Sequence, residues 1–355
     1  MPETSKPDFV VVGAGPAGAA FAYYATSEGY SVEVYEGVNF ASKPCGWAVP
    51  LQVERYIKVP NEVILTTING FRIYIDGKLV HESSGQRWGY ILDKPKFIES
   101  LLENATVNKR FVDISDSSRP RVKGEPLFAR ERVVLAPGLV GLPGYANNAI
   151  LAVQQIFKTS EPVDTDIIEI WFDSNLVGYY WVFPRSDRTV DIGVGGYEDA
   201  ESLRSRLEKF VETRFRGLEP LTLVKGARIN VSGANTSLLL REVPIIGEAA
   251  GFVYPLTGEG IRPSIASAYA LFNNITRGDD VSKHLGSITR WINLQLKLLN
   301  KIRTASPEIR VNILAALPID VFTSLGLGEL SPRQLLRLLP RLPKGVASIL
   351  RVLIS

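Results

Sequence analysis

The stretch FVVVGAGPAGAAFAYYA, residues 9–25, decides the fold. Its first four residues are apolar and predict a buried strand, and a glycine turn follows them. The next residues favour a helix from about Pro16 to Glu28, with Gly29 as its stop. Residues 31–36 alternate in polarity and predict a second strand. The chain therefore opens with a strand–helix–strand unit of a parallel sheet.

The glycines of this turn have the spacing of a dinucleotide-binding site. Gly13 permits the tight turn, Gly15 lets a pyrophosphate approach the backbone N–H groups of the helix N-terminus, and Gly18 lets helix and strand pack closely. Glu36 ends the second strand and is placed to accept hydrogen bonds from ribose hydroxyls. Its charge disfavours a 2′-phosphate, so the residues alone leave NAD and FAD as candidates.

The composition is that of a globular protein: 355 residues, of which 45% are hydrophobic and 22% charged. A single cysteine and two histidines exclude intramolecular disulfides and make a metal site unexpected, and we expect a reducing, cytoplasmic location. The net charge of +3 is too small to indicate a nucleic-acid partner. Glycines and a proline interrupt the apolar stretch at 9–25, so we expect neither a signal peptide nor a membrane span there.

The rest of the chain predicts a mixed α/β fold, in which a Rossmann-type domain is interleaved with a mainly antiparallel sheet domain and followed by a helical C-terminal region. Predicted elements include a hairpin around Asp76-Gly77, antiparallel strands within 167–196, a buried strand at 243–250 (VPIIGEAA) and a helix at 260–274. The predicted dinucleotide-binding domain is discontinuous and consists of residues 1–55, 85–150 and 228–283. The predicted substrate-binding domain consists of residues 56–84 and 151–227, and the predicted helical region of residues 284–355.

Later motifs carry a resemblance to a known family. IGEAAG at 246–251 leads to PLTGEGI at 255–261, which resembles the second FAD fingerprint of the para-hydroxybenzoate hydroxylase class. YYWVFP at 179–184, followed by Gly193-Val194-Gly195, is similar to the YxWxFP…GxG motif of the geranylgeranyl reductase family. Pro44-Cys45-Gly46 and GYILD at 89–93 resemble further elements of that family. The resemblance covers about residues 8–280.

The resemblance implies an FAD cofactor and a set of residues that contact it. These are Gly13, Gly15, Ala17, Gly18, Glu36, Cys45, Gly46, Lys94, Glu248, Gly258, Gly260 and Ile261. Lys94 stands where the family usually has Arg, and Glu248 where it usually has Asp. The resemblance also implies that Tyr179, Trp181 and Phe183 line a tunnel for a prenyl chain.

The implied activity is reduction of C=C bonds in geranylgeranyl or polyprenyl chains of isoprenoid lipids. The sequence has no second GxGxxG, so we expect the electrons to come from an external donor, either NAD(P)H or a small electron carrier. Two alternatives stay open. One is a flavin monooxygenase or other oxidoreductase of the same class, and the other is a flavin or lipid binder without turnover.

Cys45 and the three aromatic residues also have structural interpretations. Reduction of an isolated C=C bond needs a hydride on one carbon and a proton on the other, and the Cys45 thiol is a candidate proton donor. The alternative is a small residue that packs near the flavin. Tyr179, Trp181 and Phe183 alternate along one strand and so share a face, which suits either a tunnel wall or ordinary sheet packing.

Positive charge is concentrated near the C-terminus. Residues 297–355 contain nine Lys and Arg and three Asp and Glu, a local +6, whereas the rest of the chain carries −3. Arg333, Arg337 and Arg341 recur every four residues between leucines. Such a basic amphipathic face predicts peripheral contact with the inner face of an anionic membrane. The alternative is a solvated helix face whose leucines pack on the body.

Overall fold

The computed structural model describes residues 6–39, 42–139 and 148–329. It confirms the predicted N-terminal unit as part of a four-stranded parallel sheet, in the order β11-β1-β2-β8. The strands are β1 (Phe9–Val12), β2 (Val32–Tyr35), β8 (Thr106–Asn108) and β11 (Arg132–Leu135). Helices α1 (Pro16–Ser27) and α4 (Ile261–Arg277) pack on each other beside this sheet. Phe21 of α1 meets Phe9 and Phe272 edge to face, so sheet and helices share one aromatic core.

A second, larger sheet has eight strands in the order β16-β12-β15-β14-β13-β5-β6, with β17 also paired to β12. All its described pairs are antiparallel except β5 with β13. The strands are β5 (Gly70–Ile75), β6 (Lys78–Ser83), β12 (Ala149–Thr159), β13 (Ile167–Phe172), β14 (Gly178–Ser186), β15 (Thr189–Gly196), β16 (Leu218–Pro220) and β17 (Lys225–Asn230). Helix α3 (Ala200–Arg214) covers one face, where Tyr180 stacks on Phe210 with ring centres 4.5 Å apart.

Smaller elements join the two sheets. Strands β3 (Ala48–Pro50), β7 (Gly89–Leu92) and β4 (Ile64–Ile68) form a three-stranded sheet, and β9 (Arg121–Val122) pairs with β10 (Glu125–Pro126). Helix α2 (Lys94–Leu101) follows β7 and begins at the Asp93 cap. Short 3-10 turns lie at Leu51–Arg55, Asn61–Val63, Thr236–Leu238 and Gly247–Ala250.

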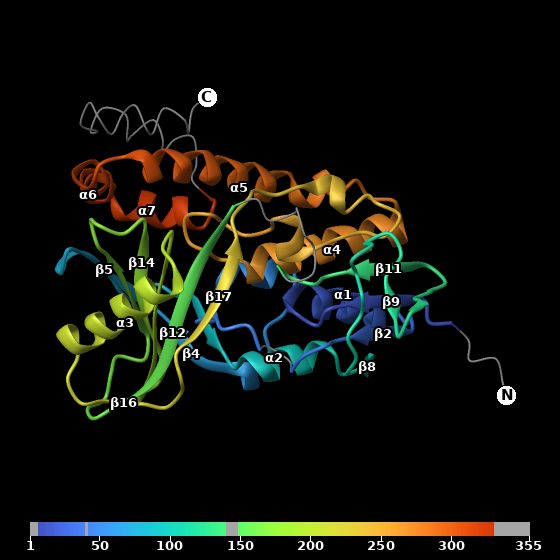
Figure 1. Cartoon of the computed structure of the whole chain (residues 1–355), viewed down its shortest axis with the longest axis horizontal. Coiled ribbons are helices and arrows are strands. Elements are labelled where there is room, and N and C mark those ends of the chain that lie inside the picture. Colours follow the sequence, from blue (N-terminus) through green and yellow to red (C-terminus); the bar gives the residue numbers. More distant parts are fainter. Residues whose placement is uncertain (1–5, 40–41, 140–147, 330–355) are drawn as a thin grey trace.

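Helices α5 (Val281–Thr304), α6 (Pro307–Ala316) and α7 (Ile319–Gly326) confirm the helical C-terminal region up to Gly326 and run along one side of both sheets (Figure 1). Glu329, after α7, accepts hydrogen bonds from Arg55 and Gln52 and so ties this region to the N-terminal part. The basic repeat at 333–341 lies outside the described residues. Among the described residues, no single helix has the length and apolar composition to cross a membrane, and only the sharply bent pair of α6 and α7 meets both conditions together.

Two features of the chain differ from the sequence-based expectation. The predicted strand at 243–250 is wrong: Ile245 forms only a single bridge to Leu135, and a 3-10 turn follows. The chain turns there because Gly247 adopts a φ of +71° and approaches Ala17 closely. Strand β12 was not predicted, since its 11 residues owe their extended form to ladders with β15 and β17 rather than to a local pattern.

Candidate active site

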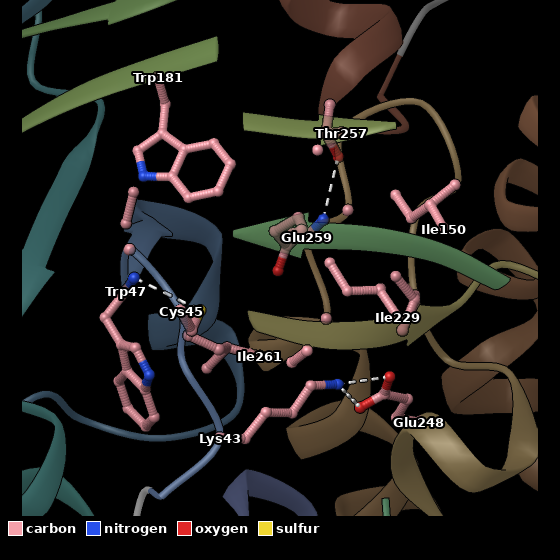
Figure 2. A pocket seen from close by; sticks show the side chains of 18 of the residues that line it. Lys43, Cys45, Trp47, Ile150, Trp181, Ile229, Glu248, Thr257, Glu259 and Ile261 are labelled. Atoms are coloured by element: carbon pink, nitrogen blue, oxygen red, sulfur yellow. Dashed lines mark hydrogen bonds and ion pairs between the residues drawn. The ribbon is translucent and has the colours of Figure 1, made fainter. Parts of the chain in front are cut away.

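One cavity of about 1140 Å³ connects the glycine turn after β1 with the large sheet and the C-terminal helices. All the predicted site residues except Gly18 line it, from the first glycine of the turn at one end to the aromatic residues of β14 at the other, and Gly18 packs behind the turn against Gly13 and Ala136. Figure 2 shows the middle of this cavity, with Cys45 between Trp47, Trp181 and Ile261. The fold therefore brings together segments that are far apart in the sequence.

The glycine turn leaves room for a ligand at the N-terminus of α1. A Cβ atom at Gly13 would lie 2.3 Å from the carbonyl oxygen of Ala136, and one at Gly18 would lie 1.9 Å from that of Gly13, so both must be glycine. A Cβ at Gly15 would meet nothing within 4 Å. No side chain caps this helix, so backbone N–H groups of its first turn, which includes Ala17, are left for a ligand.

Glu36 lies beside this turn and is held by the backbone. Its Oε2 accepts a hydrogen bond from the Ala14 N–H at 2.8 Å, and its Oε1 accepts one from the Val38 N–H at 3.1 Å. The carboxylate is thus fixed at the cavity wall with lone pairs to spare for hydroxyl groups.

Glu248 lies across the cavity and forms an ion pair that the sequence did not reveal. Lys43 Nζ donates to Oε1 at 2.6 Å and to Oε2 at 2.5 Å, and the Asn230 N–H donates to Oε1 at 3.0 Å (Figure 2). Gly258, Gly260 and Ile261 follow on the same wall at the start of α4, where the Glu259 carboxylate accepts a hydrogen bond from the Arg262 N–H at 3.0 Å.

Cys45 sits in a tight turn beside two aromatic residues and two lysines. Its sulfur accepts a weak hydrogen bond from the Trp47 N–H at 3.4 Å and is exposed toward the cavity. Burial raises the pKa of the Cys45 thiol, while the Lys94 charge and the Trp47 N–H act to lower it. The thiol is accessible from the cavity yet poorly solvated, which favours the protonated form.

Lys94 opens helix α2 and reaches into the same turn. Its ammonium donates to the Lys43 carbonyl oxygen and lies 5.3 Å from the centre of the Trp47 ring. Burial lowers the pKa of Lys94 to about 8, and the interactions of Lys94 with Cys45 and Asp191 partly offset this effect. Trp47 itself is buried and packs edge to face on Phe97.

The aromatic residues of β14 alternate as predicted. Tyr179, Trp181 and Phe183 line the cavity, whereas Tyr180 and Val182 belong to the apolar cluster under α3. The Tyr179 hydroxyl donates to the carbonyl oxygen of Thr257, which fixes its ring near the start of α4. The wall continues over apolar residues of the C-terminal helices, including Leu298, Ile302, Ile313, Leu317, Phe322 and Leu325.

Trp181 is held by two glycines that belong to separate motifs. A Cβ at Gly193 would lie 2.1 Å from Trp181 Cζ2, and one at Gly46 would lie 3.1 Å from Trp181 Nε1. The indole thus rests on β15 with its N–H edge beside the turn that carries Cys45. This packing gives a physical reason for the Cys-Gly and GxG elements at these positions.

Asp191 is the residue that sequence reasoning missed. It is fully buried on β15, where its Oδ1 accepts from Trp181 Nε1 at 2.9 Å and its Oδ2 accepts from Gln154 Nε2 at 3.0 Å. Burial raises the pKa of Asp191 to about 6, against the opposing effect of the Trp181 hydrogen bond and the charges of Arg185 and Lys94. An acidic residue within the apolar segment TVDIGVGG was the only signal in the sequence.

The residues present fit FAD. The cavity offers an open glycine turn at an uncapped helix N-terminus for a pyrophosphate, a fixed carboxylate at Glu36 for a ribose, and the N-terminus of a second helix, α4, at Ile261. Among residues 6–39, 42–139 and 148–329, no group of His, Cys, Asp and Glu is arranged to hold a metal ion.

Two family models match the chain. That of the geranylgeranyl reductase catalytic domain matches residues 148–228, and that of an NAD(P)-binding Rossmann-like domain matches residues 11–49. The first contains β14, β15 and Asp191, and the second contains the glycine turn, Glu36 and Cys45.

Curated relatives and solved structures agree with these matches. The chain is 25% identical over 299 residues to a digeranylgeranylglycerophospholipid reductase of Thermoplasma acidophilum, covering 73% of this chain and 75% of the relative. It is 26% identical over 283 residues to a geranylgeranyl diphosphate reductase of Rhodobacter capsulatus, and this match covers 72% of this chain and 71% of the relative.

Among solved structures, the fold resembles a geranylgeranyl bacteriochlorophyll reductase-like protein of Thermoplasma acidophilum, with a TM-score of 0.76 at 21% identity over 98% of this chain and 99% of that one. A flavoprotein/dehydrogenase of Cytophaga hutchinsonii matches with a TM-score of 0.68 at 16% identity, and the match covers 99% of this chain and 100% of that one. The predicted fold class is thereby confirmed. The chain is thus similar in sequence to geranylgeranyl reductases and in fold to a geranylgeranyl bacteriochlorophyll reductase-like protein.

Proposed function

We propose that the protein reduces C=C bonds in geranylgeranyl or related polyprenyl chains of isoprenoid lipids. The observation that carries this proposal is the continuous cavity, which joins the FAD-type glycine turn to Cys45 and then to an apolar wall under the C-terminal helices. A long isoprenoid chain needs such an apolar channel, and the two named relatives act on geranylgeranyl compounds.

The predicted cofactor contacts divide along this cavity. Gly13, Gly15, Ala17, Gly18 and Glu36 would hold the adenosine and pyrophosphate half of FAD. Glu248, Gly258, Gly260 and Ile261 would hold the ribityl chain and the flavin ring, with Lys43 as an added cation beside Glu248. Cys45, Gly46 and Lys94 would lie between the flavin and the aromatic wall.

Bound FAD, once reduced, supplies a hydride to one carbon of the C=C bond. We propose that Cys45 supplies the proton to the other carbon: the S–H bond breaks, a C–H bond forms, and a thiolate remains. The Lys94 ammonium beside this turn stabilises the thiolate until a proton from solvent restores the thiol. Tyr179, Trp181 and Phe183 would hold the prenyl chain and exclude water from the reacting bond.

The activity is tested on purified protein reconstituted with FAD. After anaerobic reduction with dithionite, a geranylgeranyl lipid should gain mass in pairs of hydrogens. Hydrogen peroxide or a hydroxylated product under air would indicate a monooxygenase instead, and flavin reduction without product over a panel of prenyl lipids would indicate a binder. NADH, NADPH and a reduced ferredoxin, each in place of dithionite, identify the external donor.

The role of Cys45 is tested with Cys45→Ser. This variant should keep bound FAD, since serine fits the same space, and should lose most C=C reduction. A loss of about 10²-fold or more is expected for removal of a positioned general acid. Unchanged reduction by a FAD-loaded Cys45→Ser protein would leave Cys45 as a packing residue only.

We also propose peripheral membrane contact through residues 297–355, carried by their net charge of +6. The full chain should co-sediment with anionic vesicles more than with neutral ones. Replacing Arg333, Arg337 and Arg341 by Gln should weaken this binding. Equal co-sedimentation of the two proteins would reject a role for this basic repeat.

A further inference from the structure

Asp191 is a buried carboxylate that the proposed reaction has not yet used. It is 0% exposed and forms no ion pair with any other described residue. Its two hydrogen-bond donors, Trp181 and Gln154, are both neutral. A buried carboxylate destabilises a fold unless its charge is compensated, so an amide or apolar residue would be the more stable choice at this position.

The neighbours of Asp191 lead directly to Cys45. Its Oδ1 holds the Trp181 indole N–H, and the same N–H edge lies beside Gly46, which follows Cys45 in the chain. The position of Trp181 relative to the Cys45 turn therefore depends on the Asp191 hydrogen bond.

Cys45 also lies between two opposite charges. Lys94 binds the Lys43 carbonyl oxygen, two residues before Cys45. Asp191 lies behind Trp181 on β15. Their effects on the pKa of the Cys45 thiol are opposite: the Lys94 charge lowers it and the Asp191 charge raises it. The other charged groups that act here are Lys43 on Cys45 and Arg185 of β14 on Asp191.

We propose that Asp191 is a positioning residue of this site, which fixes the Trp181 indole against Gly46 and, as the negative charge opposed to Lys94, adds to the effect of burial in keeping the Cys45 thiol protonated. This inference rests on the proposed function in one respect: a proton donor must carry its S–H proton when the substrate arrives. The structural arrangement itself is independent of that role.

The test uses the fact that Cys45 is the chain's only cysteine. The ultraviolet thiolate absorbance of FAD-loaded protein, with the same protein carrying Cys45→Ser as the blank, reports the ionisation of this one thiol without a reagent. In Asp191→Asn the thiol should ionise at a pH lower by about 0.5–1 unit, because a negative charge that raises the pKa of the thiol is removed. Asparagine keeps an acceptor for the Trp181 N–H, so bound FAD should be retained.

Two further variants complete the test. Lys94→Met should move the thiol ionisation to higher pH, and the double variant with Asp191→Asn should return toward the wild-type value. Glu169→Gln is the matched control, because Glu169 is also a largely buried carboxylate that accepts an indole N–H, from Trp171 at 2.9 Å, but it does not act on Cys45. It should leave the thiol ionisation unchanged.

An unchanged thiol ionisation in Asp191→Asn, or an equal shift in Glu169→Gln, would overturn the inference. In Asp191→Asn the fall of the reduction rate at alkaline pH should also shift to lower pH, by about the same 0.5–1 unit as the thiol ionisation. If the thiol shifts as expected while Cys45→Ser still reduces substrate, the proposed role of Cys45 fails and the charge balance around it stands.

Discussion

Gly193 lies directly under the Trp181 ring, and one added methyl group there measures how firmly the aromatic wall is fixed. In Gly193→Ala the new Cβ would lie 2.1 Å from Trp181 Cζ2 and 2.6 Å from both Cε2 and Cη2. Strand β15 is paired with β14 on one side and β12 on the other, so its backbone has little freedom to retreat. The indole must therefore leave its place.

The cost of this displacement has two parts. Forcing an extra methyl group into a packed site costs about 1–3 kcal/mol. A displaced indole also leaves the buried Asp191 carboxylate without one of its two donors, which costs about another 1–3 kcal/mol. We expect a loss of about 2–6 kcal/mol in the free energy of unfolding, seen as a lower thermal midpoint, together with a higher KM for prenyl substrates.

Gly195→Ala is the control on the same strand. A Cβ there would lie 3.3 Å from Ala152 Cβ, a contact that a small shift relieves, so we expect a change below about 1 kcal/mol. Thermal unfolding followed by circular dichroism and steady-state reduction kinetics compare the two proteins. Equal midpoints and equal KM values for the two variants would refute the reasoning that Gly193 supports the Trp181 wall.

Three other changes have defined outcomes. Gly18→Ala places a Cβ 1.9 Å from the Gly13 carbonyl oxygen and should abolish folding or FAD binding. In Gly15→Ala the new Cβ meets nothing within 4 Å, so this protein should fold but bind FAD weakly, as measured by flavin absorbance per chain. A Gly15→Ala protein with full FAD content would contradict this expectation. Burial raises the pKa of Asp191 from 3.8 to about 6, so the native state loses stability as the pH rises from about 4 to 6. In thermal melts, Asp191→Asn should therefore be more stable than the wild type by about 1–3 kcal/mol at pH 7. Below about pH 4 the two proteins should be equally stable. Phe322→Ala should enlarge the cavity under α7 and raise the rate for longer prenyl chains relative to shorter ones, and unchanged chain-length preference would place the substrate elsewhere.

The features that the sequence predicted well depend on short-range patterns. The glycine turn, the acidic end of β2 and the alternation of aromatic residues along β14 are each complete within a few residues, and the structure places all of them on one cavity. The domain boundaries and the individual cofactor contacts remain predictions.

The features that the sequence did not reveal depend on partners far along the chain. Lys43 pairs with Glu248 only because the Cys45 turn and the segment after β17 meet across the cavity. Asp191 reads as an ordinary polar residue of a strand until Trp181 and Gln154 close over it from the two neighbouring strands. No local pattern specifies such pairs, since they arise from how the sheets and loops pack.

The C-terminal helices give the cavity a particular place in the order of folding. The floor of the cavity begins at Val12 and its aromatic wall is made at β14, but the helices that cover it, α5 to α7, are synthesised afterwards. The contact of Glu329 with Gln52 and Arg55 then joins the last described residue to the turn that follows β3. Closure of the cavity is consequently a late, long-range event in folding. Until it occurs, the nascent chain exposes an apolar trough, and a chain that ends before α5 leaves this trough open to aggregation.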